Sequence, residues 1–134
     1  MRTAEQQQMA RKHIFAVNSA PEFLDLVREL LQDEHFNVTT TNYVPRTFEQ
    51  IAGLKPDLLL IDLVVGIEAG WDLLARLEAE ALTQGTPVIV TSTDPALLER
   101  AEAQRKHFRS SRYLVKPLDL DVLLAAVGEL IGEA

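Results

Sequence analysis

Short runs of apolar residues alternate with amphipathic stretches five times along the chain. The runs lie at residues 14–17, 36–41, 58–61, 88–91 and 113–115, and the second is the weakest because it is rich in β-branched residues rather than uniformly apolar. Runs of this length that are apolar on both faces are typical of strands buried on both sides of a parallel sheet. The pattern therefore predicts five strands.

The stretch after the first run predicts an amphipathic helix. Its apolar residues recur at i, i+3, i+4, i+7 and i+8, and they are Phe23, Leu26, Val27, Leu30 and Leu31. This spacing places them on one buried stripe. Ser19 and Glu22 have the spacing of a capping box, and Pro21 stands near the first helical position, so we expect Ser19 to cap this helix.

Four further helices are expected after the other runs. They are predicted at residues 47–52, 71–82 and 94–108, and from residue 119 to the region of residue 132. Gly53 and Pro56 are expected to end the first of these, and Gly85 and Pro87 follow the end of the second. Asp119 is expected to cap the last.

A strand followed by a helix, repeated five times, predicts an α/β fold with three layers. Parallel strands with right-handed crossovers form a doubly wound open sheet, and the natural order of five such strands is 2-1-3-4-5. We expect one domain over residues 12–134, after a polar tail at residues 1–11. Ligands bind such a sheet at the carboxyl ends of the strands, at the switch point between the first and third.

Charge and composition exclude several kinds of function. The 134 residues carry a net charge of −7, which argues against nucleic acid as a partner because phosphate binding needs clustered cations. No apolar run approaches the ~20 residues of a membrane span, so no membrane partner is expected. The absence of cysteine excludes disulfides, thiolate metal sites and cysteine nucleophiles, and it fits the cytoplasm, where we expect the protein.

Polar residues directly follow four of the predicted strands. Asn18 and Ser19 follow the first, Asp62 the third, Ser92 the fourth and Lys116 the fifth. A carboxylate can act as a nucleophile, an ammonium can neutralise phosphoryl oxygens, and a hydroxyl can donate a hydrogen bond to one of them. The carboxyl edge is therefore predicted to bind a small anion or a phosphoryl group.

Four segments carry a set of motifs at fixed spacing. They are residues 56–62 (PDLLLID), Gly70, residues 87–92 (PVIVTS) and residues 113–119 (YLVKPLD). Together they resemble the receiver domain of bacterial response regulators, over roughly residues 12–132. The resemblance implies the flavodoxin-like receiver fold, with a cis peptide bond in the Lys-Pro pair of the last segment.

The resemblance also implies roles for five residues. Asp62 would accept a phosphoryl group from the phosphohistidine of a histidine kinase or phosphotransfer protein, with magnesium present. Lys116 would pair with the acyl phosphate, Ser92 would be the switch hydroxyl, and Tyr113 would be the aromatic residue that turns inward with it. The backbone carbonyl of Val64 would be a magnesium ligand.

The segment after the first strand departs from the family's pattern. Two adjacent acidic residues usually stand there, and here they are Asn18 and Ser19. Magnesium prefers carboxylate oxygens, and the ligands that remain are Asp62, the carbonyl of Val64 and the uncharged Asn18. We therefore expect weak magnesium binding and a nearly neutral ion pair between Asp62 and Lys116.

The loop after Asp62 departs from the pattern too. The proline that usually stands four residues after the acceptor is Gly66 here. Glycine has more backbone freedom, so we expect this loop to be more mobile than in the family.

Basic residues concentrate on the fourth predicted helix and the loop after it. They are Arg100, Arg105, Lys106, His107, Arg109 and Arg112. A charged stretch of this kind is ordinarily a solvated helical face. In the family, the fourth helix, fifth strand and fifth helix commonly form the output face. Arg105, Lys106, Arg109 and Arg112 are therefore alternatively interpreted as a surface for a downstream protein partner or a homodimer.

Two functions remain open from the sequence. One is a single-domain response regulator that is phosphorylated on Asp62 and switches a protein-interaction surface. The other is a pseudo-receiver that binds a protein partner without phosphorylation. The intact Asp62, Ser92 and Lys116 favour the first, and the missing acidic pair favours the second. No enzyme is expected, because a dehalogenase-like phosphatase would need an Asp at Val64 and a flavodoxin-like phosphate loop would need a glycine within residues 16–21.

Overall fold

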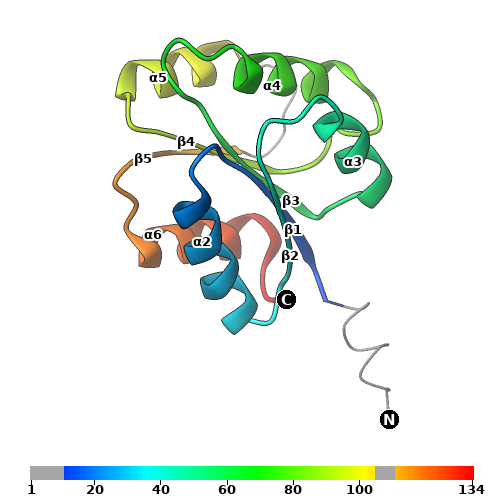
Figure 1. Ribbon diagram of the computed structural model, residues 1–134. Coiled ribbons are helices and arrows are strands. Elements are labelled where there is room, and N and C mark those ends of the chain that lie inside the picture. Colours follow the sequence, from blue (N-terminus) through cyan, green and yellow to red (C-terminus); the bar gives the residue numbers. More distant parts are fainter. Residues whose placement is uncertain (1–10, 105–110) are drawn as a thin grey trace.

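Among residues 11–104 and 111–134, which the computed structural model describes, five parallel strands form one sheet in the order β2-β1-β3-β4-β5 (Figure 1). The strands are β1 (His13–Val17), β2 (Asn37–Thr41), β3 (Leu58–Asp62), β4 (Val88–Ser92) and β5 (Ser111–Val115). The helices are α2 (Pro21–Asp33), α3 (Thr47–Leu54), α4 (Ala69–Ala79), α5 (Pro95–Gln104) and α6 (Leu120–Ile131). The predicted α/β class and strand order are confirmed.

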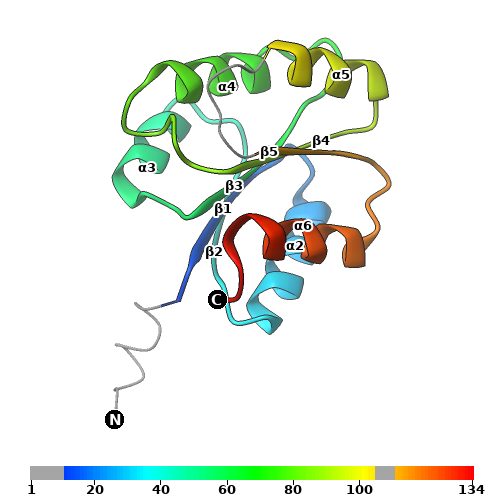
Figure 2. The same cartoon turned by 180° about the vertical axis from the view of Figure 1, so that it is seen from behind.

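Helices cover both faces of the sheet, with α3, α4 and α5 on one face and α2 and α6 on the other (Figures 1 and 2). Successive residues of a strand point to opposite faces, so the strands contribute to two apolar cores. The strand residues on the α3/α4/α5 face are Phe15, Val17, Leu59, Ile61, Val88 and Val90. Those on the α2/α6 face are Ile14, Ala16, Leu58, Leu60 and Ile89. This alternation fixes the face toward which each site residue points.

Burial is deepest along the centre of the sheet. Every residue of β3 and β4 is buried, whereas β2 and β5 form its partly exposed edges. The carboxyl end of β3 therefore lies in the middle of the sheet, between β1 and β4. In the described part of the chain, no helix has the length and apolarity needed to cross a membrane.

The start of α2 differs from the prediction. The N-cap is Ala20, which makes no side-chain capping bond, so the capping box expected from Ser19 is wrong. The backbone N–H of Ala20 instead donates to Asn18 Oδ1 at 2.8 Å, which ties the turn to the preceding strand. The buried stripe is also shifted, because Leu24 is buried while the predicted Leu26 is 46% exposed.

Two helix ends also differ from the prediction. Helix α3 passes through Gly53 and ends at Leu54, and its C-cap, Lys55, adopts a left-handed conformation with φ of 50°. Helix α4 ends at Ala79 rather than at residue 82, because the Thr83 hydroxyl donates to the carbonyl of Leu77 at 2.7 Å and stabilises a turn there.

The predicted cap of the last helix is confirmed. Asp119 Oδ1 accepts from the backbone N–H groups of the first turn of α6.

Gly70, in the first turn of α4, allows this helix to approach the end of β3 closely. A Cβ atom at this position would lie 2.9 Å from Leu63 Cδ2 and 3.1 Å from the backbone carbonyl oxygen of Asp62. Real Cβ atoms do not approach other atoms at the first of these distances. The glycine in the sequence motif therefore reflects a packing requirement directly beside Asp62.

We expect Gly70→Ala to destabilise the fold by about 1–3 kcal/mol, because the added methyl group overpacks this contact. Gly53→Ala is the matched control, since a Cβ there meets nothing within 4 Å. That substitution should stabilise the helix by about 0.5–1 kcal/mol. Urea denaturation of both variants measures the difference, and equal stabilities would contradict the packing argument.

Candidate functional site

Asp62 is the last residue of β3, and its side chain lies on the α2/α6 face of the sheet. It is 5% exposed, so its carboxylate is largely removed from water. Oδ1 accepts a hydrogen bond from Thr91 Oγ1 at 2.7 Å and lies 2.9 Å from Lys116 Nζ. A buried charge requires such partners, because an uncompensated carboxylate is costly inside a protein. The ion pair expected between Asp62 and Lys116 is therefore present.

Strand alternation explains which polar residues meet at Asp62. Thr91 stands opposite Asp62 in the register of β3 and β4, and the two side chains point to the same face. Ser92, one residue further, points to the α3/α4/α5 face. Its hydroxyl donates to the carbonyl of Leu63 at 2.7 Å and accepts from the N–H of Asp94 at 3.1 Å. The hydroxyl that contacts the carboxylate in this structure is thus that of Thr91, which the sequence reasoning missed.

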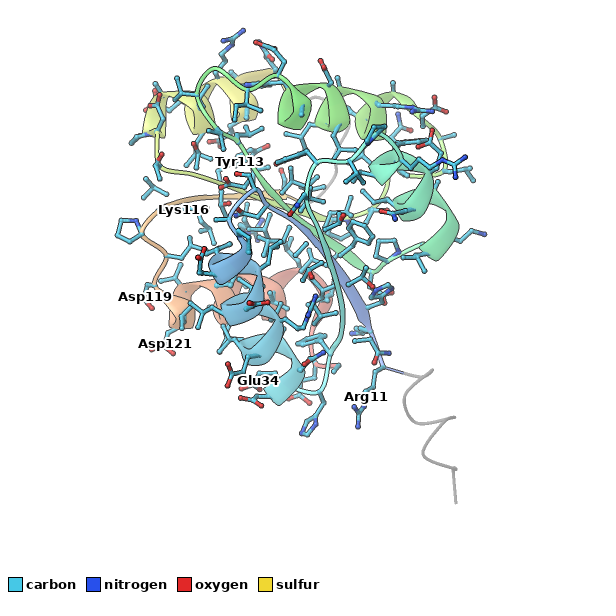
Figure 3. All side chains as sticks on the ribbon, in the orientation of Figure 1. Arg11, Glu34, Tyr113, Lys116, Asp119 and Asp121 are labelled. Atoms are coloured by element: carbon cyan, nitrogen blue, oxygen red, sulfur yellow. The ribbon has the colours of Figure 1, made fainter. Side chains whose placement is uncertain are left out.

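Several contacts fix the position of Lys116. Its backbone N–H donates to the carbonyl of Ser92 at 2.8 Å, and its peptide bond to Pro117 is cis, as the resemblance implies. The ammonium lies 4.2 Å from the centre of the Phe23 ring of α2, a cation–π contact. Figure 3 shows Lys116 in the segment after β5, near the start of α2. The ring and the Asp62 carboxylate together fix the position of the ammonium.

Tyr43 also contacts the acceptor residue, although no sequence motif singled it out. Its hydroxyl donates to the backbone carbonyl of Asp62. Burial raises the pKa of Tyr43 above its ordinary value, and the negative charge of Asp62 acts in the same direction. The phenol therefore remains protonated and keeps its role as a donor. The one sequence signal for this contact was the position of Tyr43 just after a strand, at the carboxyl edge.

Tyr113 lies on the other face from Asp62. It packs half-buried against the core of the α3/α4/α5 face, and its hydroxyl is 3.1 Å from Ser111 Oγ. Ser92 points to the same face, so the two residues of the predicted switch lie on the side of the sheet away from the carboxylate. Their switching role stays a prediction.

The residues present do not fit the magnesium site that the resemblance implies. Asp62 contributes one carboxylate, and its Oδ1 is already engaged by Lys116 and Thr91. The carbonyl of Val64 accepts from the N–H of Ile67 at 3.1 Å, and Asn18 Oδ1 accepts from a backbone N–H. Across residues 11–104 and 111–134, no group of three His, Cys, Asp or Glu side chains could hold a metal ion.

The loop between β3 and α4 departs from the family's pattern at Gly66, where the residue type and the backbone conformation both differ from those of a proline. Gly66 has a φ of +79°, in the left-handed region. A proline has φ fixed near −65°, so the family's usual residue cannot adopt this conformation. The loop also exposes Val65 by 62% and Ile67 by 44%, which places apolar surface near the acceptor.

The predicted basic surface is only partly described. Arg105, Lys106 and Arg109 lie outside the described residues. Arg112 is half-exposed and forms an ion pair with Glu129 of α6 at 3.2 Å, so it is not an isolated cation. Arg100 lies 5.1 Å from the centre of the Trp71 ring.

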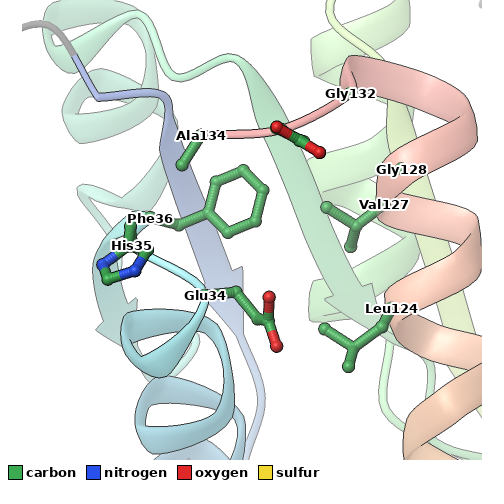
Figure 4. Close-up of a pocket in the computed structure, with 9 residues that line it drawn as sticks. Glu34, His35, Phe36, Leu124, Val127, Gly128, Gly132 and Ala134 are labelled. Carbon is green, nitrogen blue, oxygen red and sulfur yellow. The ribbon is translucent and has the colours of Figure 1, made fainter.

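A cavity of about 420 Å³ lies between the C-terminal ends of α2 and α6 (Figure 4). His35 and Phe36, which precede β2, line one side, and Val127 and Gly132 line the other. The cavity is therefore at the amino ends of the strands, the opposite edge from Asp62. It does not belong to the site around the acceptor.

A family model described as the response regulator receiver domain matches residues 14–128. Protein PilH from Pseudomonas aeruginosa is 30% identical over 78 residues, which cover 58% of this chain and 63% of PilH. The match thus spans less than two thirds of that relative. An uncharacterised 14.6 kDa protein from Leptolyngbya boryana is 27% identical over 113 residues, covering 84% of this chain and 85% of that protein.

Solved structures show the same fold. The chemotaxis protein CheY4 of Vibrio cholerae superposes with a TM-score of 0.76 at 18% identity, covering 91% of this chain and 100% of that one. The receiver domain of the sensor histidine kinase PA1611 from Pseudomonas aeruginosa, solved with a magnesium ion in its active-site cleft, gives a TM-score of 0.76 at 18% identity. That match covers 92% of this chain and 100% of that one.

We expect Lys116→Met to destabilise the protein by about 3 kcal/mol, because it leaves the buried Asp62 carboxylate without its cation. The double variant Asp62→Asn, Lys116→Met should recover part of this loss, since both charges are then gone. Arg112→Met is the matched control. Its ion pair is exposed, and breaking it should cost no more than about 1 kcal/mol. Equal losses in the free energy of unfolding for Lys116→Met and Arg112→Met, measured by urea denaturation, would show that the buried pair stabilises the protein no more than the exposed pair.

Magnesium should bind to this site with a Kd weaker than about 1 mM, because a single carboxylate is present and it is already paired. Asn18→Asp restores one carboxylate and should tighten binding by about tenfold. Isothermal titration calorimetry measures both. Submillimolar affinity of the unaltered protein would contradict the expectation.

Proposed function

The chain belongs to the response regulator receiver domain family, and on that premise we propose that it accepts a phosphoryl group on Asp62 from the phosphohistidine of a histidine kinase or phosphotransfer protein. The observation that carries the proposal is the asymmetry of the Asp62 carboxylate. Oδ1 accepts from Thr91 Oγ1 at 2.7 Å and lies 2.9 Å from Lys116 Nζ, whereas no side-chain or backbone group of the described residues donates a hydrogen bond to Oδ2. One oxygen is thus fixed and the other is available as a nucleophile.

Phosphoryl transfer to this carboxylate needs few further groups. Asp62 Oδ2 attacks the phosphorus atom, the P–N bond of the phosphohistidine breaks, and the imidazole nitrogen keeps the electron pair. The Lys116 ammonium, held beside the carboxylate by the Phe23 ring, neutralises charge on the transferred oxygens. The position of Lys116 is set before the reaction, so little reorganisation is needed when the phosphoryl group arrives.

Ser92 and Tyr113 would carry the signal to the other face of the sheet. In the unphosphorylated structure, the Ser92 hydroxyl is bound to the carbonyl of Leu63 and the N–H of Asp94. Turning toward a phosphoryl oxygen on Asp62 would exchange these bonds for a charge-assisted one. Tyr113 packs on the face to which Ser92 points, so its position would respond to this change.

The output surface would be formed by α5, β5 and α6. The edge strand β5 leaves Arg112 and Val115 exposed, and α6 leaves Val122 49% exposed. Apolar side chains at an exposed strand edge and on an adjoining helix are suited to a downstream protein partner or to a second copy of the chain. With such partners the protein would act in the cytoplasm.

A second candidate function is a pseudo-receiver that binds its partner without phosphorylation. The observation that favours it is the absence of the acidic pair, which leaves Asp62 already neutralised by Lys116. A site of this kind has no need of a cation to be stable. The fold and the output surface would then act as a fixed docking module.

Intact-mass measurement after treatment with a small phosphodonor such as phosphoramidate distinguishes the two functions. We expect a gain of one phosphoryl group in the unaltered protein and none in Asp62→Asn. Treatment should be repeated with a phosphorylated histidine-containing phosphotransfer protein as donor. No gain from either donor, with or without magnesium, would exclude the phosphoacceptor and favour the docking module.

A further inference from the structure

Asn18 has a buried donor whose hydrogen bond is not made. The residue is 2% exposed, and within the described chain its Nδ2 is the one buried side-chain nitrogen or oxygen atom without a hydrogen-bond partner. The orientation of the amide is fixed, because Oδ1 accepts from the Ala20 N–H at 2.8 Å and a flip would set two donors against each other. Leaving a buried N–H unpaired is unfavourable, because the group loses its hydrogen bond to water, so this donor requires an explanation.

The position of Asn18 places this donor beside the acceptor. Val17 and Ile61 are the last paired residues of β1 and β3, so Asn18 and Asp62 follow them on neighbouring strands. Ala16 and Leu60 both lie on the α2/α6 face, and alternation brings Asn18 and Asp62 to that same face. Asn18 and Asp62 thus follow neighbouring strands on the same face, at the edge of the sheet where a phosphoryl group on Asp62 would be held.

The charge of the site is consistent with a donor at this position. Relative to the family's pattern, Asn18 and Ser19 remove two negative charges, and with them the need for a doubly charged cation. Asp62 and Lys116 already neutralise each other. An N–H group attracts anionic oxygens and repels a cation, so the site around Asp62 is arranged to receive an oxyanion directly.

We propose that Asn18 is a phosphoryl-binding residue that takes over part of the role that magnesium has in the family. In the phosphorylated protein, Asn18 Nδ2 donates to one oxygen of the aspartyl phosphate and the Lys116 ammonium binds another. The site therefore accepts and holds a phosphoryl group without a divalent cation. This inference rests on the proposed function, because it concerns the same reaction at Asp62.

The test is the rate at which phosphoramidate phosphorylates Asp62 in metal-free buffer and in excess magnesium. In this step Asp62 Oδ2 bonds to phosphorus, the P–N bond breaks, and ammonia leaves with a proton taken from the donor or from water. We expect the unaltered protein to react at the same rate in both buffers. A rate that collapses when magnesium is removed would overturn the proposal.

Three variants isolate the contribution of the Asn18 amide. Asn18→Asp keeps the acceptor for Ala20 but replaces the donor by a carboxylate, so its metal-free rate should fall by about tenfold or more and be restored by magnesium. Asn18→Ala should lose a similar factor that magnesium does not restore. Ser19→Ala, at the exposed neighbouring position, should leave both rates unchanged. If Asn18→Ala does not fold, the comparison of Asn18→Asp with the unaltered protein still decides the question.

A second readout separates this inference from the proposed function. Beryllofluoride, a phosphoryl mimic that binds a carboxylate oxygen, is added in metal-free buffer while the Asn18 side-chain amide is followed by ¹⁵N NMR. A shift of this resonance that is absent in Asp62→Asn supports the assigned role even if no donor phosphorylates the protein. An unchanged resonance in a protein that has bound beryllofluoride, or no binding without magnesium, overturns it.

Discussion

The ion pair between Asp62 and Lys116 is the interaction on which the rest of the site depends. It joins the end of β3 to the end of β5 across β4, and its two charges are largely removed from water. The surrounding contacts all serve to hold it: Thr91 donates to the same carboxylate oxygen, and the ring of Phe23 covers the ammonium. Breaking such a pair leaves a buried charge, so the geometry of the carboxyl edge is strongly determined.

This pair also changes the chemistry that the site can perform. With one carboxylate and one ammonium, the unphosphorylated site is neutral before any metal arrives. Asn18 adds a buried N–H where the family usually has a negative charge, and a donor there favours an arriving oxyanion over a bound cation. Under the proposed function, the replacement of the acidic pair changes the electrostatics of the site while Asp62 keeps its role.

The parts of the fold that follow from period and alternation could be predicted from the sequence. The order of the strands and the convergence of Asp62 and Lys116 at one edge follow from the βα repeat, and both are present. The contact of Thr91 with Asp62 does not follow from the motif, whose hydroxyl is that of Ser92, although the register of the parallel strands places Thr91 opposite the acceptor. The alternation of side chains along the strands, together with this register, is sufficient to predict the contact.

Other features depend on loop conformation, which sequence patterns do not predict. Tyr43 contacts Asp62 from the segment after β2, although β1 lies between β2 and β3 in the sheet. The capping box at Ser19 is absent because α2 begins one residue later than the spacing suggests, with Ala20 at the N-cap position. Helix α3 continued through Gly53 because its end is set by the left-handed conformation of Lys55.

A crystal structure of the protein grown with both beryllofluoride and magnesium tests whether this site receives a phosphoryl group through its own donors rather than through a metal ion. We expect beryllofluoride on Asp62 Oδ2, with Asn18 Nδ2 and Lys116 Nζ in contact with its fluorine atoms and no metal ion at the site. A magnesium ion coordinated by Asp62 and the carbonyl of Val64, with Asn18 turned away, would contradict it.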